Sequence, residues 1–156
     1  MIKVEVRFDT SKLDRMLHDF PAALARAQRK ALSAIGAHVA SEATRAFRAP
    51  ALRPSPWAPR KDTRHGGRES GRDSHPLLIK SGALRQSISW RVTAPDTVVV
   101  GSDKKYGPYH QFGTKNMPAR PFFPIDKSGR LTPRMMRKIN ADIEKAFTSE
   151  MRKLGG

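Results

Sequence analysis

The feature that most constrains the fold is a long amphipathic run between Ala22 and Arg48. Its apolar residues recur every three or four positions, which places them on one side of an α-helix. Many of these side chains are alanines, so the helix can approach a sheet or a second helix closely. We therefore predict a long helix with a packed stripe made of Leu24, Ala27, Ala31, Ile35, Val39, Ala43, Ala46 and Phe47.

The residues before this helix change their periodicity. Apolar and charged side chains alternate over residues 2–8, which predicts a half-buried strand presenting Ile2, Val4, Val6 and Phe8 on one side. Polar residues at 9–11 then precede a short apolar pattern ending at Leu17, which predicts a short helix. We expect Pro21 either to end that short helix or to open the long one.

The second half of the chain predicts a hairpin and a second long helix. Strand patterns at 88–92 and 97–100 flank a turn at 94–96, and 121–125 predicts a further short strand at a sheet edge. Thr132 and Pro133 are good first residues for a helix. Its apolar stripe comprises Met135, Ile139, Ile143, Phe147, Met151 and Leu154. We predict one α+β domain over residues 1–156, with a small antiparallel sheet packed by an N-terminal and a C-terminal helix.

A Pro-, Gly- and Arg-rich segment at residues 49–76 separates these halves. Apart from Leu52 and Trp57 it offers almost nothing to bury, and it is long for a connection within one domain. We predict a mobile basic loop, which a partner could order on binding. Its candidate contact residues are Trp57, Arg60, Lys61, Arg64, Arg68 and Arg72.

The chain is strongly basic, with 30 Lys and Arg against 14 Asp and Glu and a net charge of +16. Such a charge predicts attraction to polyanions, to an acidic protein, or to an assembly near packaged DNA. The positive charge is spread along the chain rather than gathered in one tail. No zinc finger, helix-turn-helix or RNA-recognition pattern accompanies it. Charge alone therefore leaves these partners open.

The sequence offers no recognisable catalytic or cofactor-binding pattern. It has no Cys, and its five His residues do not have the spacing of metal ligands. There is no phosphate-binding glycine motif, and Ser81 lacks the surroundings of a catalytic serine. We predict neither an enzyme nor a bound cofactor or metal. No stretch is apolar enough to predict a transmembrane helix or a signal peptide, so no membrane partner is expected.

Residues 101–125 combine aromatic side chains with many Gly and Pro residues. This composition allows two interpretations. The segment could fold back and close one end of the core with Phe122 and Phe123, or it could form a protein–protein interface. Both can hold if some aromatics point inward and others outward. Arg120 lies between Pro118 and Pro121, and we expect these neighbours to direct its guanidinium group at a partner.

An ordered series of short motifs runs through this half of the chain. It consists of Leu77-Leu78, Ser81-Gly82-x-Leu84-x-x-Ser87-Ile88, Val100-Gly101-Ser102, Tyr106, His110-Gln111-Phe112-Gly113-Thr114 and Met117-Pro118-Ala119-Arg120-Pro121-Phe122. In this order, and with the layout of the whole chain, it resembles the phage virion morphogenesis family. That family comprises tail-completion or neck proteins of long-tailed bacteriophages and of Mu-like or P2-like prophages. Residues 50–76 contribute nothing to the resemblance.

The resemblance implies a structural role without catalytic residues. It implies copies arranged in a ring, typically six, with tail-tube and head–tail connector proteins as partners. The protein would be in the host cytoplasm during assembly and at the neck or tail top of the virion, with possible non-specific contact to packaged DNA. A head-side connector and a sequence-independent nucleic-acid-binding protein are the alternatives. The implied fold-and-interface residues, with Tyr109 added from the aromatic segment, are Ser81, Gly82, Leu84, Tyr106, Tyr109, His110, Gln111, Phe112, Gly113, Pro118, Arg120, Pro121 and Phe122.

Overall fold

The computed structural model describes residues 11–58, 77–126 and 128–155. Its elements, in chain order, are α1 (Ser11–Ala46), a 3₁₀ turn (Pro50–Leu52), α2 (Ala83–Gln86), β1 (Ile88–Ala94), β2 (Thr97–Ser102), α3 (Gly107–Phe112) and α4 (Pro133–Gly155). The two strands pair antiparallel, so the predicted α+β class is confirmed. The strand predicted over residues 2–8 lies outside the described residues.

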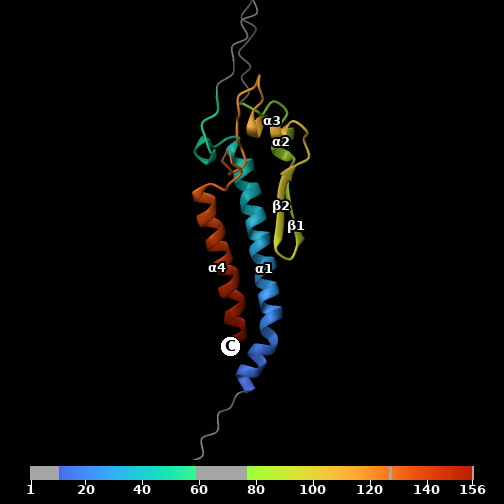
Figure 1. The fold of residues 1–156 in the computed structure, drawn as a ribbon, viewed down its shortest axis with the longest axis vertical. Helices are drawn as coiled ribbons and strands as arrows, with labels where there is room; N and C mark the ends of the chain where they lie inside the picture. Colours follow the sequence, from blue (N-terminus) through green and yellow to red (C-terminus); the bar gives the residue numbers. More distant parts are fainter. Residues whose placement is uncertain (1–10, 59–76, 127, 156) are drawn as a thin grey trace, which may run out of the picture.

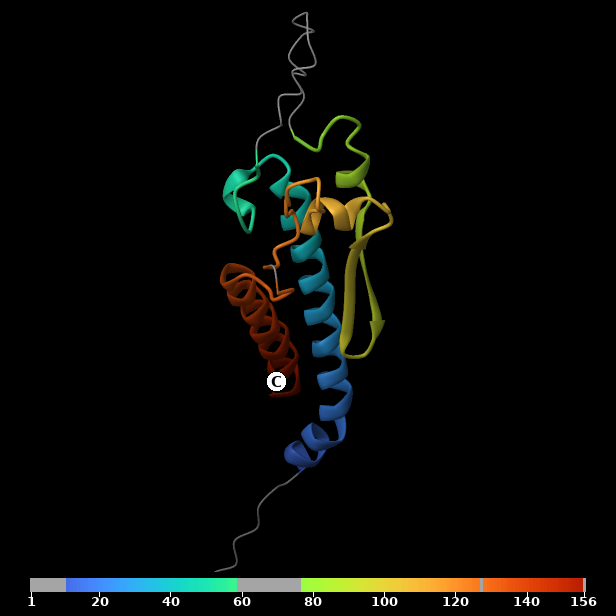
Figure 2. The same ribbon diagram turned by 45° about the horizontal axis from the view of Figure 1, so that its top comes forward.

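Helix α1 is the central element of the molecule. Figures 1 and 2 show α4 along one side of α1 and the β1–β2 hairpin along another, with α2 and α3 gathered at one end. The two long helices are antiparallel, because Lys30 of α1 contacts Glu150 of α4 while His38 contacts Asp142. Most of the predicted α1 stripe is buried, which confirms it; the residues below 9% exposure are Ala27, Ala31, Val39, Ala43, Ala46 and Phe47.

Pro21 neither ends nor opens a helix. It lies inside α1, which is continuous from Ser11 to Ala46. A proline within a helix removes one backbone hydrogen bond, but the residues on either side can keep theirs. Ala23, two positions further on, is fully buried, so tertiary packing supports the helix close to Pro21. The two predicted helices of this region are therefore one.

The hairpin packs on α1 through a close contact at Gly36. A Cβ atom at this position would come within 2.5 Å of the Trp90 ring and 2.9 Å of Val98. Glycine is therefore required here despite its poor helix propensity. The register pairs Trp90 with Val100 and Val92 with Val98. Because alternate residues of a strand share one face, these side chains lie on the face that meets α1.

The main core lies at the end of the molecule where α2 and α3 gather. Phe47 is its centre, with ring centroids 5.8 Å from Trp57 and 5.1 Å from Phe122. Residues 49–58 are thus folded onto the core. The prediction of a mobile loop over 49–76 therefore placed the start of the loop too early in the chain. The cause is the indole of Trp57, which is buried and carries the Arg53 guanidinium on its face at 3.8 Å. Residues 59–76, with Arg60, Lys61, Arg64, Arg68 and Arg72, lie outside the described residues.

Helix α4 begins as predicted. The Thr132 hydroxyl accepts a hydrogen bond from the Met135 N–H at 3.4 Å, and Pro133 is the first helical residue. Met135 and Ile139 are buried against Val39 of α1 in a second apolar cluster. Further along α4, the same stripe is largely exposed at Ile143 and Phe147.

The edge strand predicted at 121–125 does not form among the described residues. Pro121 and Pro124 have no N–H to donate. The N–H groups of Phe122 and Phe123 are both bound by the side chain of Gln111 rather than by a strand. Only an isolated bridge between Ile125 and Leu131 remains, and it closes the loop that leads into α4.

Candidate functional site

The segment around α2 joins the hairpin to the core. The Ser81 hydroxyl accepts a hydrogen bond from the Ala83 N–H at 3.3 Å, and Gly82 takes a left-handed conformation with φ of 71° before the helix. Leu84 is buried in the main core. Ser87 then donates to the Leu84 carbonyl and shares a 2.6 Å hydrogen bond with Ser102 at the end of β2. These residues fix the hairpin relative to α2 and the main core.

The side chain of Gln111 connects α3 to the chain that follows it. Its Oε1 accepts hydrogen bonds of 3.0 Å from the N–H groups of both Phe122 and Phe123. The Arg120 N–H donates to the His110 carbonyl at 2.7 Å. Gln111 is buried, so these bonds form in a site shielded from water and hold α3 firmly.

The turn after α3 requires glycine at position 113. Its φ of 77° and ψ of 178° lie in a region that side-chain-bearing residues rarely adopt. A Cβ atom there would also meet the backbone of Ala119 at 2.8 Å and of Met117 at 2.9 Å. The chain reverses between Thr114 and Met117, which share two backbone hydrogen bonds, and continues through the half-buried Pro118. Gly113 thus allows the motif at residues 110–114 to lie beside the motif at residues 117–122.

Arg120 is buried, in contrast to the predicted outward orientation. Its Nε donates to the Ala58 carbonyl at 3.0 Å. The Trp57 indole N–H donates to the Pro121 carbonyl at 2.7 Å, also within the core. These two bonds attach residues 57–58 to the segment that follows α3. Arg120, Pro121 and Phe122 therefore act in folding here, because their partners belong to the same chain.

His110 is a half-buried residue of α3. Its ring packs edge-on against Tyr106, with centroids 5.9 Å apart. Burial lowers the pKa of the His110 imidazole, and the positive charge of Arg120 lowers it further. The lowered pKa favours the neutral ring, in keeping with a buried Nδ1 that has no hydrogen-bond partner among the described residues.

Three aromatic side chains of this segment point outward. Tyr106 is 41% exposed, Tyr109 56% and Phe112 58%. They follow one another at intervals of three residues, which makes them neighbours on the surface of a helix. We call them the aromatic face. Phe122 closes the core, which confirms the first sequence-based interpretation of the segment. The second, a protein–protein interface, stays a prediction, and the exposed aromatic face is where it would form.

The described residues contain no group of three His, Cys, Asp or Glu side chains that could hold a metal ion. Among the helices of the described segments, none is both long and apolar enough to cross a membrane. The aromatic face stands on a helix held by the hydrogen bonds of Gln111 and of the His110 carbonyl, and it offers a surface that a partner could bind.

The family model for phage virion morphogenesis matches residues 8–147. The chain belongs to the phage virion morphogenesis family. Neither the curated proteins nor the solved structures gave a match to this chain. Membership agrees with a structural role in the virion and with the predicted lack of catalysis.

The residues that carry the family resemblance have two distinct environments. Most contribute to the fold: Gly82, Leu84, His110, Gln111, Gly113, Pro118, Arg120, Pro121 and Phe122 are buried or half-buried. Ser81 is exposed and accepts a hydrogen bond from the N–H of Ala83, the first residue of α2. Tyr106 and Phe112, with the neighbouring Tyr109, form the aromatic face. Gly36 was not among the predicted site residues, although a glycine inside an otherwise regular helix pattern is a signal of close packing.

Proposed function

We propose that this protein completes the top of the phage tail, or joins the tail to the head, as one copy in a ring around the DNA channel. Six copies are expected from the family resemblance. The partners would be neighbouring copies, tail-tube proteins and head–tail connector proteins.

The aromatic face is the observation that carries this proposal. Tyr and Phe side chains bury large areas at low entropic cost, and they are frequent anchors of protein interfaces. Here they stand on a short helix that Gln111, Arg120 and Gly113 hold in place. A preorganised surface loses little freedom on binding, which suits a subunit contact that must form repeatedly and in one geometry.

The charge supports a position close to DNA. A net charge of +16 per copy would make a ring of copies repel itself unless phosphates or acidic neighbours compensate. The same charge supports the second candidate, a sequence-independent nucleic-acid-binding protein. That activity alone predicts an affinity for DNA that falls steeply with salt and does not depend on Tyr109 or Phe112.

Electron microscopy of lysates tests the proposal. A phage carrying an early stop codon in this gene should yield full heads beside separate tails of abnormal length if the protein acts at the tail top. Normal tails beside heads that have lost DNA would place it on the head side. Intact joined particles would refute an assembly role altogether.

A double variant then tests the aromatic face. Tyr109→Ser with Phe112→Ser should prevent complementation of the stop-codon phage while the protein remains folded. The matched control is Val99→Ser, because Val99 is an exposed hydrophobic residue of comparable exposure in the hairpin, away from α3. Full complementation by the double variant would exclude the aromatic face as an assembly contact.

A further inference from the structure

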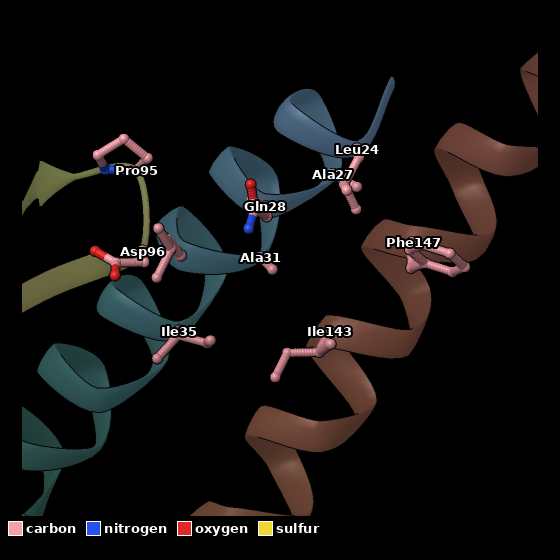
Figure 3. A pocket seen from close by; sticks show the side chains of 10 residues that line it. Leu24, Ala27, Gln28, Ala31, Ile35, Pro95, Asp96, Ile143 and Phe147 are labelled. Atoms are coloured by element: carbon pink, nitrogen blue, oxygen red, sulfur yellow. The ribbon is translucent and has the colours of Figure 1, made fainter. Parts of the chain in front are cut away.

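A second apolar surface lies away from α3, between α1, α4 and the hairpin turn. It is a groove of about 300 Å³, shown in Figure 3. Its lining is apolar except for Gln28 and Asp96, and includes Leu24, Ala27, Ala31, Leu32, Ile35, Pro95, Ile143 and Phe147. The two α4 side chains are more than 40% exposed, so the groove is open to solvent in the described structure.

The apolar face of α1 that lines the groove continues towards the N-terminal end of this helix. Leu17 and Phe20 are exposed by 64% and 41%, and they precede Leu24 at helical spacing on the same face. Figure 1 shows this N-terminal part of α1 extending past the C-terminal end of α4. An elongated apolar strip that leads into a groove fits an extended chain segment better than a compact small molecule.

We propose that residues 1–10 of the same chain bind along this strip, with their apolar side chains in the groove. The segment joins α1 directly at Ser11. Its apolar residues, Ile2, Val4, Val6 and Phe8, are spaced two apart, so an extended conformation presents all of them on one side. Polar residues occupy the positions between them, as expected for a strand with one face buried.

The length of the segment matches the strip. From Ser11 back to Ile2 an extended chain covers about 30 Å. The same distance along α1 corresponds to about twenty residues at roughly 1.5 Å each. A segment that turned back at Ser11 would therefore pass Leu17 and Phe20 and bring Ile2 level with Ala31, inside the groove.

Charge and connectivity favour the segment of the same chain. Asp96 is the only charged residue that lines the described groove, so little charge there opposes an apolar segment. A segment tethered directly to α1 has an effective concentration of about millimolar or more. A second copy would have to approach against the repulsion of two +16 chains.

Cysteine cross-linking tests this proposal, because the natural chain has no Cys. The test variant carries Ile2→Cys with Gln28→Cys, which lies on the groove floor. The control carries Ile2→Cys with Ser33→Cys, about 140° further round α1 but at a similar height. With a short bismaleimide in dilute protein, we expect intramolecular cross-linking of the test variant to exceed that of the control by about tenfold.

A second pair of variants separates specific binding from mere proximity. In the test background, Val4→Ser with Val6→Ser should abolish most of this excess, whereas Glu5→Ser with Arg7→Ser should preserve it. Equal cross-linking at Gln28 and Ser33, or equal loss in both serine variants, would overturn the proposal. Covalent dimers through Gln28 in place of the intramolecular product would overturn it in favour of a neighbouring copy. None of these outcomes depends on the proposed role in phage assembly.

Discussion

The two ends of the α1–α4 pair are built in different ways. At the end near Phe47, aromatic rings from three separate segments interlock, and Gln111, Arg120 and Trp57 bind backbone groups inside the core. At the other end, the helices are joined by a charged cluster around Glu150, while apolar residues such as Phe147 remain exposed. Both helices carry apolar stripes along their length. Large apolar side chains are buried where a third segment covers the stripe, whereas at the charged end small side chains such as Ala23 and Ala27 are buried while Phe147 is not.

This difference predicts where the free energy of unfolding is concentrated. The aromatic end should contribute most, because truncating a buried side chain there removes apolar contacts and leaves a cavity. The charged end should contribute less and should depend on pH. Single substitutions at the two ends of the helix pair test this division.

Phe122→Ala should lower the free energy of unfolding by about 3–5 kcal/mol, because Phe122 is 1% exposed and contacts Phe47. Urea denaturation followed by circular dichroism measures the change. The control is Phe112→Ala in the same segment, where the ring is exposed and the cost should stay within about 0.5 kcal/mol. Similar costs at the two positions would contradict the distinction between core residues and aromatic face.

Adjacent methionines of α4 provide a second comparison. Met135 is fully buried and Met136 is exposed. Met135→Ala should cost about 2–5 kcal/mol, and Met136→Ala should cost about 0.5 kcal/mol or less. Thermal and urea unfolding of both variants would measure the difference. If Met136→Ala proved equally costly, this part of α4 would have to be covered by a segment outside the described residues.

Gln111→Met keeps the approximate size of the side chain and removes the acceptor used by the Phe122 and Phe123 N–H groups. Leaving buried donors unpaired should cost about 1–3 kcal/mol. Gln86→Met is the control, because Gln86 is exposed at the end of α2. Hydrogen exchange should also show faster exchange in α3 of the Gln111 variant, and unchanged protection would argue against its role as a connector.

The smallest effect is expected at Glu150. Hydrogen bonds from Lys30, Lys153 and Arg26 lower the pKa of its carboxyl group to about 2 from the usual 4.5. A depressed pKa in the folded state stabilises the protein above pH 4.5, and this contribution is lost as the pH falls towards 2. The three cationic side chains are about half exposed, so solvent weakens each pair.

Glu150→Gln should therefore destabilise the protein at pH 7 and reduce the loss of stability on acidification from pH 4.5 to 2. Some dependence will remain, because hydrogen bonds involving Ser128 and Arg130 lower the pKa of Asp126 to about 2 as well. Urea unfolding at a series of pH values measures the stability of the natural protein and of the Glu150→Gln variant. An unchanged pH profile would mean that the charged cluster does not hold the two helices together.

Local sequence patterns determined the secondary structure of most of the described chain. The spacing of apolar residues predicted both long helices, Thr132 and Pro133 marked the start of α4, and alternation predicted the hairpin. These signals depend on neighbours within a few residues, and they are therefore readable from the sequence. The ordered motifs around Gln111 and Arg120 were also sufficient to indicate the family that the family model confirms.

Tertiary contacts decided the remaining features. Pro21 is accommodated inside α1, Trp57 orders residues that by composition form a loop, and Gln111 takes the N–H groups that a strand at 121–125 would have needed. Arg120 points inward because the Ala58 carbonyl lies beside it. In each case the partner is distant in sequence, so no local pattern contains it. The same reason explains why Met135 is buried and Phe147 is exposed on one stripe of α4.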